Sequence, residues 1–360
     1  MKKIIALVLL LKITVSFGQT AENIIIITTD GFRWQEIFTG MDSAIANNKK
    51  FNQGDSAAIF KKYWANDPNE RRKKLLPFLW STIEKNGQVY GNRNFDAKVN
   101  NANRYWFSYP GYNEIFTGYP DTAVNSNDYK ANPNTTLLEF LNKRPKFKGK
   151  VAAFGAWFAF RRILNAERSG VPVINGFDNP GGKDPSRNEV MINKLLQDAY
   201  KPFDDEECLD VFTHYAAMEY LQNKRPKVLY ISYGETDEWA HEGRYKDYLN
   251  AANKVDKWVN DIWNFIQSDS RYKNKTALFI TTDHGRGYIE KEDWRSHNSK
   301  YTGSDQIWFV AMGPGIHAKG EIKKPVQFYQ EQFAQTMADL LGEYFKCEHP
   351  VAKKIDLNAE

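Results

Sequence analysis

Short apolar runs that stop at polar turns recur along this 360-residue chain. Residues 24–27 are four consecutive isoleucines, and the run ends in a Thr-Thr-Asp-Gly turn that contains Asp30. Residues 228–234 and 277–282 repeat this pattern. A continuous apolar run of this length is typical of a parallel strand that is buried on both faces. The pattern therefore predicts three buried parallel strands.

Helical periodicity follows the second of these strands. Apolar side chains recur there at steps of three and four residues, which predicts an amphipathic helix that packs on the sheet: Tyr248, Ala252, Val255, Val259, Ile262 and Ile266. Residues 150–154 and 307–311 are also strand-like. With 42% hydrophobic residues, the chain can bury a sizeable core. We expect an α/β fold with a central, mostly parallel sheet and helices on both faces.

Acidic residues and histidines follow the predicted strands. Ligands of open α/β sheets bind outside the carboxyl ends of the strands, so acids that emerge there converge on one crevice. Asp237 and His241 are four residues apart, which places both on one face of a helical turn. Asp283 and His284 are adjacent and precede a Gly-Arg-Gly bend. With Asp30, these residues predict a two-metal hydrolase; the ligand types favour Zn²⁺ and also suit Mn²⁺.

A serine offers a nucleophile. Ser108 begins a Ser-Tyr-Pro-Gly-Tyr segment that predicts a turn feeding a helix. A hydroxyl at a helix N-terminus lies near unpaired N–H groups and the positive end of the dipole, which suits alkoxide formation and an anionic substrate. Taken alone, Asp30 and Ser108 would also fit as helix-capping residues without chemistry.

The order of these motifs resembles the alkaline phosphatase superfamily, especially the branch of nucleotide pyrophosphatases/phosphodiesterases and secreted phosphatases with a Thr or Ser nucleophile. The similarity runs from about Ile24 to Gly315 and rests on Thr-Asp-Gly, Ser-x-Pro-Gly, Asp-x-x-x-His, Asp-His-Gly and a late histidine. It implies an alkaline-phosphatase-like three-layer sandwich and a phosphate ester hydrolase with two divalent metal ions. It also implies that Ser108 forms a covalent phosphoserine.

The resemblance assigns the ligands residue by residue. One metal would be held by Asp30, Asp283 and His284, and the other by Asp237, His241 and a late histidine. His297 fits this last position best, because it lies shortly after the Asp-His-Gly motif and before a strand-like segment. The three remaining histidines fit a packed core position or loop positions instead: His214, His317 and His349.

Relatives also place an asparagine about twenty residues after the nucleophile to bind a phosphoryl oxygen. Asn127 and Asn125 both fit, and spacing does not choose between them. Two features depart from the family pattern. Tyr112 stands where close relatives have His, and the Lys-x-Arg pair of some monoesterases is missing. The resemblance therefore favours phosphodiester or nucleotide substrates only somewhat over monoesters.

The N-terminus predicts export. Lys2 and Lys3 precede an apolar run, and small residues occupy the positions that a signal peptidase reads before Gln19. We expect a signal peptide over residues 1–18 and one catalytic domain over residues 19–360, with segments 40–74 and 165–198 as insertions or caps. The mature protein would be periplasmic or secreted. The apolar run is too short for a permanent membrane anchor.

Charge and cysteine content limit the classes of function that remain open for this chain. A net charge of +5 without a dense basic stripe predicts no nucleic-acid-binding surface, so the expected partner is a small phosphate ester. Cys208 and Cys347 could form a disulfide after export. The alternatives are a sulfatase-like or phosphomutase-like member of the superfamily, or a secreted metal-binding protein without activity. The arginine of the usual sulfatase motif is missing after Ser108, and a mutase normally works in the cytosol.

Overall fold

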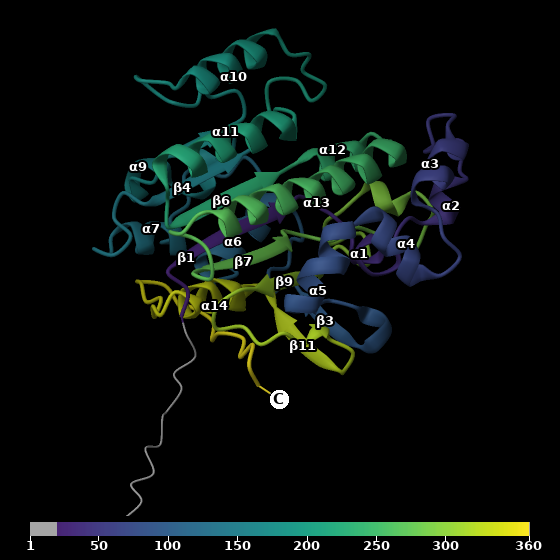
Figure 1. The fold of residues 1–360 in the computed structure, drawn as a ribbon. Helices are drawn as coiled ribbons and strands as arrows, with labels where there is room; N and C mark the ends of the chain where they lie inside the picture. The colour runs from purple at the N-terminus through teal and green to yellow at the C-terminus, as the bar shows by residue number, and fades with distance from the viewer. Residues whose placement is uncertain (1–19, 360) are drawn as a thin grey trace, which may run out of the picture.

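An eight-stranded sheet forms the centre of this computed structural model, which describes residues 20–359 (Figure 1). Its strand order is β10-β2-β9-β7-β1-β6-β4-β5, and a small second sheet has the order β11-β3-β8. The strands are β1 Asn23–Thr29, β2 Gly87–Tyr90, β3 Ala97–Asn100, β4 Val151–Gly155, β5 Val173–Asn175, β6 Val228–Tyr233, β7 Thr276–Thr282, β8 Gln306–Ile307, β9 Phe309–Met312, β10 Gly320–Glu321 and β11 Val326–Tyr329. The expected signal peptide, residues 1–18, lies outside the described residues.

Parallel pairing dominates the large sheet. Strand β1 pairs in parallel with both β6 and β7, and β4 pairs in parallel with β6 and β5. Only β9 runs against its neighbours β7 and β2. The three strands expected from the apolar runs are therefore confirmed, and they lie side by side in the order β7-β1-β6.

Both faces of the sheet are covered, which explains why β1 is apolar at every central position. Ile25 and Ile27 point into one core together with α13, whereas Ile24 and Ile26 point into a second core together with α6 and α14. All four side chains are fully buried. The expected three-layer α/β fold is confirmed.

Fourteen α-helices surround the sheet within the described residues. They are α1 Trp34–Thr39, α2 Ser43–Ala46, α3 Ser56–Tyr63, α4 Pro68–Leu75, α5 Glu84–Asn86, α6 Ser108–Thr117, α7 Leu137–Asn142, α8 Phe160–Ile163, α9 Ala166–Ser169, α10 Arg187–Asp198, α11 Asp210–Lys224, α12 Glu235–His241, α13 Tyr245–Ser268 and α14 Phe333–Leu340. Short π and 3-10 turns are η1 Leu79–Ile83, η2 Arg93–Phe95, η3 Asp293–Arg295 and η4 Gln330–Gln332. The six apolar residues expected to face the sheet from α13 are all buried.

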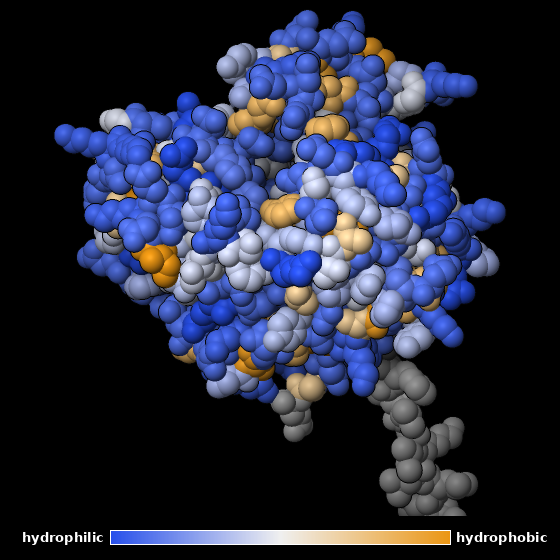
Figure 2. Space-filling view, turned by 180° about the vertical axis from the view of Figure 1, so that it is seen from behind, coloured by the Kyte–Doolittle hydropathy of each residue, from blue (hydrophilic) through white to orange (hydrophobic). Residues whose placement is uncertain are grey.

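The two polar segments contain regular structure. Residues 40–74 include α2 and α3 and most of α4, and residues 165–198 include α9, β5 and α10. Helix α10 projects beyond the main body, and it exposes Val190, Met191 and Leu195 (Figure 1). The face seen in Figure 2 is mostly hydrophilic, with scattered apolar side chains.

Three further expectations can be compared with the structure. Among residues 20–359, no helix is both long and apolar enough to cross a bilayer. Cys208 and Cys347 do not pair; the Cys208 thiol lies near Thr213 and the Cys347 thiol near His349. His214 is a packed core residue, as expected from its helical context, because it is buried and stacks on Trp258 in α13.

Candidate two-metal active site

Three acidic side chains meet at the carboxyl ends of three neighbouring strands. Asp30 directly follows β1, Asp283 directly follows β7, and Asp237 lies in α12, which begins two residues after β6. Because β1 pairs with both other strands up to its last residue, Thr29, the chain leaves the sheet at the same level in all three. The three acids therefore lie together at one edge of the sheet.

One group consists of Asp30, Asp283 and His284, whose ligand atoms lie within 4.8 Å of one another. The Nε2 atom of His284 is 3.3 Å from Oδ1 of Asp30 and 3.3 Å from Oδ2 of Asp283. These two carboxylate oxygens are buried and have no hydrogen-bond partner among the described residues. Buried polar atoms are almost always paired, so two unpaired carboxylate oxygens beside an imidazole fit a cation site.

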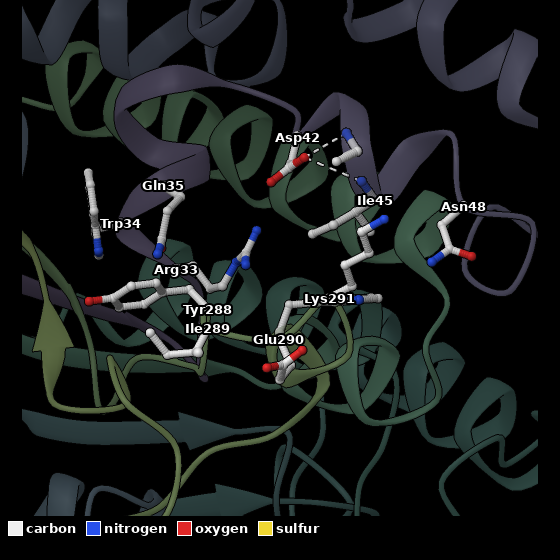
Figure 3. A pocket seen from close by; sticks show the side chains of 12 residues that line it. Arg33, Trp34, Gln35, Asp42, Ile45, Asn48, Tyr288, Ile289, Glu290 and Lys291 are labelled. Atoms are coloured by element: carbon white, nitrogen blue, oxygen red, sulfur yellow. Dashed lines mark hydrogen bonds between the residues drawn. The ribbon is translucent and has the colours of Figure 1, made fainter.

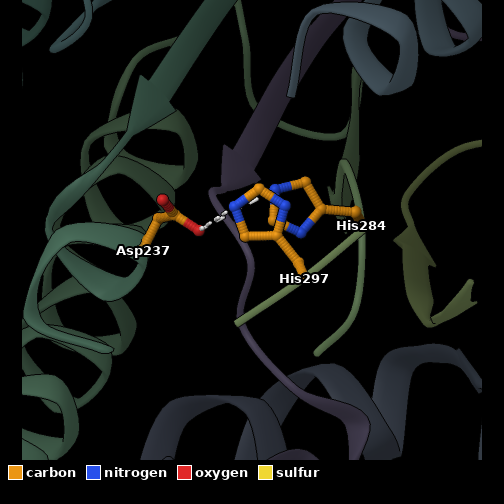
Figure 4. A group of neighbouring side chains, drawn as sticks. All are labelled: Asp237, His284 and His297. Atoms are coloured by element: carbon orange, nitrogen blue, oxygen red, sulfur yellow. Dashed lines mark ion pairs between the residues drawn. The ribbon is translucent and has the colours of Figure 1, made fainter. Parts of the chain in front are cut away.

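The second group lies on the solvent side of the first. Asp237, His284 and His297 form a cluster within 4.8 Å, with Asp237 on α12 and the imidazoles close together near the end of β1 (Figure 4). His241 completes it: its Nε2 atom is 2.9 Å from Oδ2 of Asp237 and 3.0 Å from Nε2 of His297. The structure thus brings together all six side chains assigned as ligands.

Each carboxylate of the site has one oxygen held by a protein donor. Tyr112 donates its hydroxyl to Oδ2 of Asp30 at 2.8 Å, and the backbone N–H of Gly31 donates to Oδ1 of Asp283 at 3.0 Å. Arg286 binds Oδ1 of Asp237. In Asp237, the oxygen that Arg286 binds is also the one that lies nearest His284 and His297, at 3.8 Å and 3.7 Å. Asp30 and Asp283 each turn their other oxygen towards His284. That orientation suits binding of a metal through one oxygen.

Burial and neighbouring charges shift the pKa values of the three site carboxylates in different directions. Burial, together with the neighbouring charge of Asp237, raises the pKa of Asp30 well above its usual range. Burial, with the charge of Asp30, does the same to the pKa of Asp283. Burial also acts to raise the pKa of Asp237, but Arg286 and the histidines His241 and His297 outweigh it and hold that pKa well below its usual range. A cation between Asp30 and Asp283 would offset their mutual repulsion.

Ser108 lies at the edge of the first group. Helix α6 begins at this residue, and its hydroxyl is 3.4 Å from Nε2 of His284. The residue before the helix is Phe107 and no side chain caps it, so Ser108 does not serve as the helix cap. Helix α6 packs closely against Asp283, one of the candidate metal ligands. A β-carbon at Gly111 would lie 2.5 Å from the carbonyl oxygen of Asp283.

The two candidate asparagines are placed differently. The side-chain oxygen of Asn127 accepts a 3.0 Å hydrogen bond from the backbone N–H of Tyr109, which follows Ser108. Asn125 is exposed, and its side chain makes no hydrogen bond within the part of the chain described. Asn127 is therefore the candidate asparagine that lies at the start of α6.

Three residues of the site environment had no role in the sequence-based expectations. Arg286 is 1% exposed, and Tyr112, noted only as a departure from the family pattern, is fully buried. Glu114 is buried in α6 and accepts hydrogen bonds from the backbone N–H groups of Ala102 and Asn103, just ahead of Ser108. For Tyr112, the sequence contained one indication of this position: it lies four residues, about one helical turn, after Ser108 and therefore on the same face of the helix.

A pocket of about 360 Å³ opens beside the loop that carries His297 (Figure 3). Its wall combines residues of α1 and α2 with the loop around Tyr288 and Trp294. The guanidinium of Arg33 in this wall is paired with Glu36 and is therefore not a free anion-binding group. None of the six candidate metal ligands lines this pocket.

Comparisons with known proteins identify the family and the fold. The family model described as type I phosphodiesterase / nucleotide pyrophosphatase matches residues 38–354. No curated protein matches the sequence. Among solved structures, the wild-type alkaline phosphatase PafA is similar with a TM-score of 0.59 at 11% identity, over 94% of this chain and 99% of that one.

Two further structures share the fold. The murine ectonucleotide pyrophosphatase/phosphodiesterase 5 has a TM-score of 0.52 at 12% identity, over 92% of this chain and 97% of that one. The lipoteichoic acid synthase LtaP from Listeria monocytogenes has a TM-score of 0.53 at 14% identity, over 93% of this chain and 75% of that one. The chain therefore belongs to the type I phosphodiesterase/nucleotide pyrophosphatase family of the alkaline phosphatase superfamily, and it is a phosphoric ester hydrolase.

Proposed function

We propose that this protein is an exported hydrolase that cleaves phosphate esters with two divalent metal ions and Ser108 as the nucleophile. The observation that carries this proposal is the placement of the Ser108 hydroxyl 3.4 Å from His284, the residue shared by the two ligand clusters. A hydroxyl beside the residues that would hold the two ions is placed to attack a phosphoryl group in line.

Asp30, Asp283 and His284 would hold one metal ion, and Asp237, His241 and His297 the other. Oxygen and imidazole ligands favour Zn²⁺, and Mn²⁺ is the alternative. When bound, the two ions lower the pKa of the attacking hydroxyl and neutralise charge on the phosphoryl and leaving oxygens.

The protein's own groups would act in two steps. Ser108 loses its proton to solvent, and its oxygen forms a bond to phosphorus while the bond to the leaving oxygen breaks. The leaving group departs with that electron pair and takes a proton from water. A water molecule then attacks the phosphoserine, which restores Ser108 and releases the phosphorylated product. Asn127 supports both steps by donating its amide to a phosphoryl oxygen from the start of α6.

We propose phosphodiester or nucleotide substrates ahead of simple monoesters. The support comes from the family, and from an inactive Thr-to-Ala variant of the murine ectonucleotide pyrophosphatase/phosphodiesterase 5 that was solved in complex with AMP. Sulfate esters are a weaker candidate, because Ser108-Tyr109-Pro110-Gly111-Tyr112 carries no arginine.

The test compares three substrates on mature protein, residues 19–360: p-nitrophenyl phosphate, bis-p-nitrophenyl phosphate and p-nitrophenyl sulfate. Rates are measured after chelation and after zinc is added back. We expect chelation to abolish turnover, zinc to restore it, and the diester to be the best substrate. Ser108→Ala should bind the same amount of zinc without turnover.

The matched control is Ser81→Ala, because Ser81 is an exposed serine of η1. It should keep the full rate. Turnover by Ser108→Ala close to that of the control would eliminate Ser108 as the nucleophile. Hydrolysis of the sulfate alone would move the protein to the sulfatase-like alternative, and no turnover with bound zinc would support the non-catalytic one. Export is tested separately by N-terminal sequencing of secreted protein, which should begin at Gln19.

A further inference from the structure

We infer that a cavity beside the first residue of β7 binds an uncharged carbohydrate, at a site separate from the candidate metal centre. The cavity has a volume of about 480 Å³, which lies within the range of small-ligand pockets. Its wall is built from the end of α5, one face of α13, the turn before β7 and the segment after β9. We call it the amide cavity, and the residues that define it are Asn86, Trp263, Gln267, Asn274, Thr276 and Met312.

The amide cavity lies at the opposite end of the sheet from the candidate metal ligands. Thr276 is the first residue of β7 and lines the cavity, whereas Asp283 directly follows the last residue of that strand. At about 3.3 Å per residue of strand, these two residues are roughly 23 Å apart. A ligand in the cavity would therefore not touch the metal site, and the inference does not depend on the proposed function.

No charged side chain lines the amide cavity, although 26% of the residues of the chain are charged. The pocket beside the loop of His297 is different, because its wall includes Asp42, Glu290 and Lys291. An ion that entered the amide cavity would lose water without gaining a group of opposite charge. The lining therefore selects an uncharged ligand.

Side-chain amides and an indole supply the hydrogen-bonding groups of the cavity. The amides of Gln267 and Asn274 and the indole N–H of Trp263 have no hydrogen-bond partner among the described residues. Asn86 donates its amide to the carbonyl oxygen of Thr82, which leaves its side-chain oxygen as an acceptor. An amide both donates and accepts, and so does a hydroxyl. A ligand with many hydroxyls can therefore pair with these groups.

The apolar part of the lining explains why a sugar ring fits better than a small polyol. Trp263 lies one turn before Gln267 in α13, so both side chains are on the same face of that helix. Met312 is buried, whereas Asn86 and Asn274 are exposed and form the rim. A pyranose ring has an apolar C–H face and an edge of hydroxyls. Its face would lie on the indole while its edge meets the amides.

The test is saturation-transfer NMR on mature protein in the presence of zinc. The neutral probes are cellohexaose, maltohexaose and N-acetylchitohexaose, and a hexamer of galacturonic acid is the anionic probe. We expect at least one neutral probe to bind with a dissociation constant on the order of 1 mM or lower. The C–H protons of one face of a sugar ring should receive the most saturation. The anionic hexamer should not displace the neutral probe.

Variants assign the binding to the amide cavity. Trp263→Ala removes the stacking face and should weaken binding by about tenfold. Gln267→Glu keeps the shape, but it loses the NH2 donor and adds a charge, so it should weaken binding by roughly the same factor. Trp64→Ala is the matched control, because Trp64 is also half-buried but lies outside the cavity, where its indole donates to Asn66.

Hydrolysis of bis-p-nitrophenyl phosphate separates this site from the metal site. The three variants should hydrolyse it at the wild-type rate, because none of the changed residues lies near the candidate ligands. Circular dichroism checks folding. If Trp263→Ala does not fold, Gln267→Glu still decides, since it changes a half-buried side chain without altering its size.

Four results would overturn the inference. They are no binding by any neutral probe, wild-type binding by the folded cavity variants, displacement of the neutral probe by the anionic hexamer, and a dimer in sedimentation experiments that Trp263→Ala abolishes. The last result would assign the cavity to a second copy of the chain. Absence of hydrolysis by wild type would count against the proposed function alone.

Discussion

Tyr112 donates a 2.8 Å hydrogen bond to Oδ2 of Asp30, so the helix that begins at Ser108 also holds a carboxylate of the candidate metal-binding group. The bond is part of a buried chain. Ser232 lies 3.1 Å from the Tyr112 oxygen, and Thr28 donates to Ser232 at 3.0 Å. Because an ionised Asp30 can only accept, Tyr112 must donate to it and accept from Ser232. Hydrogen bonds aligned in this way strengthen one another.

Replacement of Tyr112 by phenylalanine should weaken zinc binding by Asp30, Asp283 and His284 by roughly tenfold to a hundredfold, the usual cost of losing a group that orients a metal ligand. A zinc titration of metal-free protein in competition with a fluorescent zinc chelator measures this loss. Tyr109→Phe is the matched control, since Tyr109 is a buried tyrosine of the same helix whose hydroxyl donates to Lys130 instead. Equal zinc affinities in the two variants would show that Tyr112 does not orient Asp30.

Asn127→Asp should lower kcat/KM by roughly a hundredfold while the melting temperature changes little. The aspartate keeps an oxygen for the Tyr109 N–H and thus the start of α6, but it loses the amide that would donate to the phosphoryl oxygen. Steady-state kinetics on the diester and thermal unfolding provide the two readouts. Asn125→Asp is the control and should behave like wild type. If only Asn125→Asp loses activity, the assignment must move to that residue.

Glu114→Gln should destabilise the protein by about 2 to 3 kcal/mol. Oε1 of Glu114 accepts from the N–H groups of Ala102 and Glu331, and Oε2 accepts from the N–H and the side chain of Asn103. In a glutamine, one of these two oxygens is replaced by an NH2 group, which donates and would therefore face two other donors without an acceptor. Urea unfolding at pH 8 measures the loss, with Glu331→Gln as control because only the backbone of Glu331 takes part. A loss no larger than that of the control would contradict the prediction.

Asp256 should make the stability of metal-free protein fall as the pH rises from about 4 to 8. Its carboxylate accepts the N–H groups of Phe78 and Leu79, but burial still raises its pKa from 3.8 to about 7. The folded state therefore holds a proton that the unfolded state loses near pH 4. The stability tied to this proton is complete below pH 4 and is lost as the pH passes 7, on the order of 4 kcal/mol.

Urea unfolding between pH 4 and pH 8 tests the Asp256 prediction. The unfolding free energy of Asp256→Asn should depend less on pH than that of wild type. Asp261→Asn, which removes a partly exposed carboxylate paired with Lys257 on the same helix, should leave the wild-type slope unchanged. Parallel pH profiles for wild type and Asp256→Asn would exclude this role for Asp256.

The sequence predicted the parts of the site that depend on local pattern. The isoleucine run before Asp30 identified a central strand, because only a strand covered on both faces is apolar at every position. The spacing of Asp237 and His241 predicted the turn that became α12. These features can be read from neighbouring residues alone.

The partners of the ligands could not be predicted in this way. Arg286 lies 49 residues from Asp237 in the chain, and Tyr112 lies 82 residues from Asp30. An arginine or a tyrosine in a sequence is most often a partly exposed residue, and only the tertiary contact shows what it holds. The choice of Asn127 over Asn125 at the start of α6 depended on tertiary contact in the same way.

The contact between Gly111 and Asp283 has a consequence for how the candidate active site moves. With no side chain at Gly111, helix α6 rests directly on the backbone at the end of β7, and no flexible group lies between them. A shift of Asp283 and His284 during thermal motion should therefore carry Ser108 along. The distance from the Ser108 hydroxyl to Asp283 and His284 would then vary less than either of these segments moves relative to the rest of the protein, and an alanine at position 111 would uncouple them.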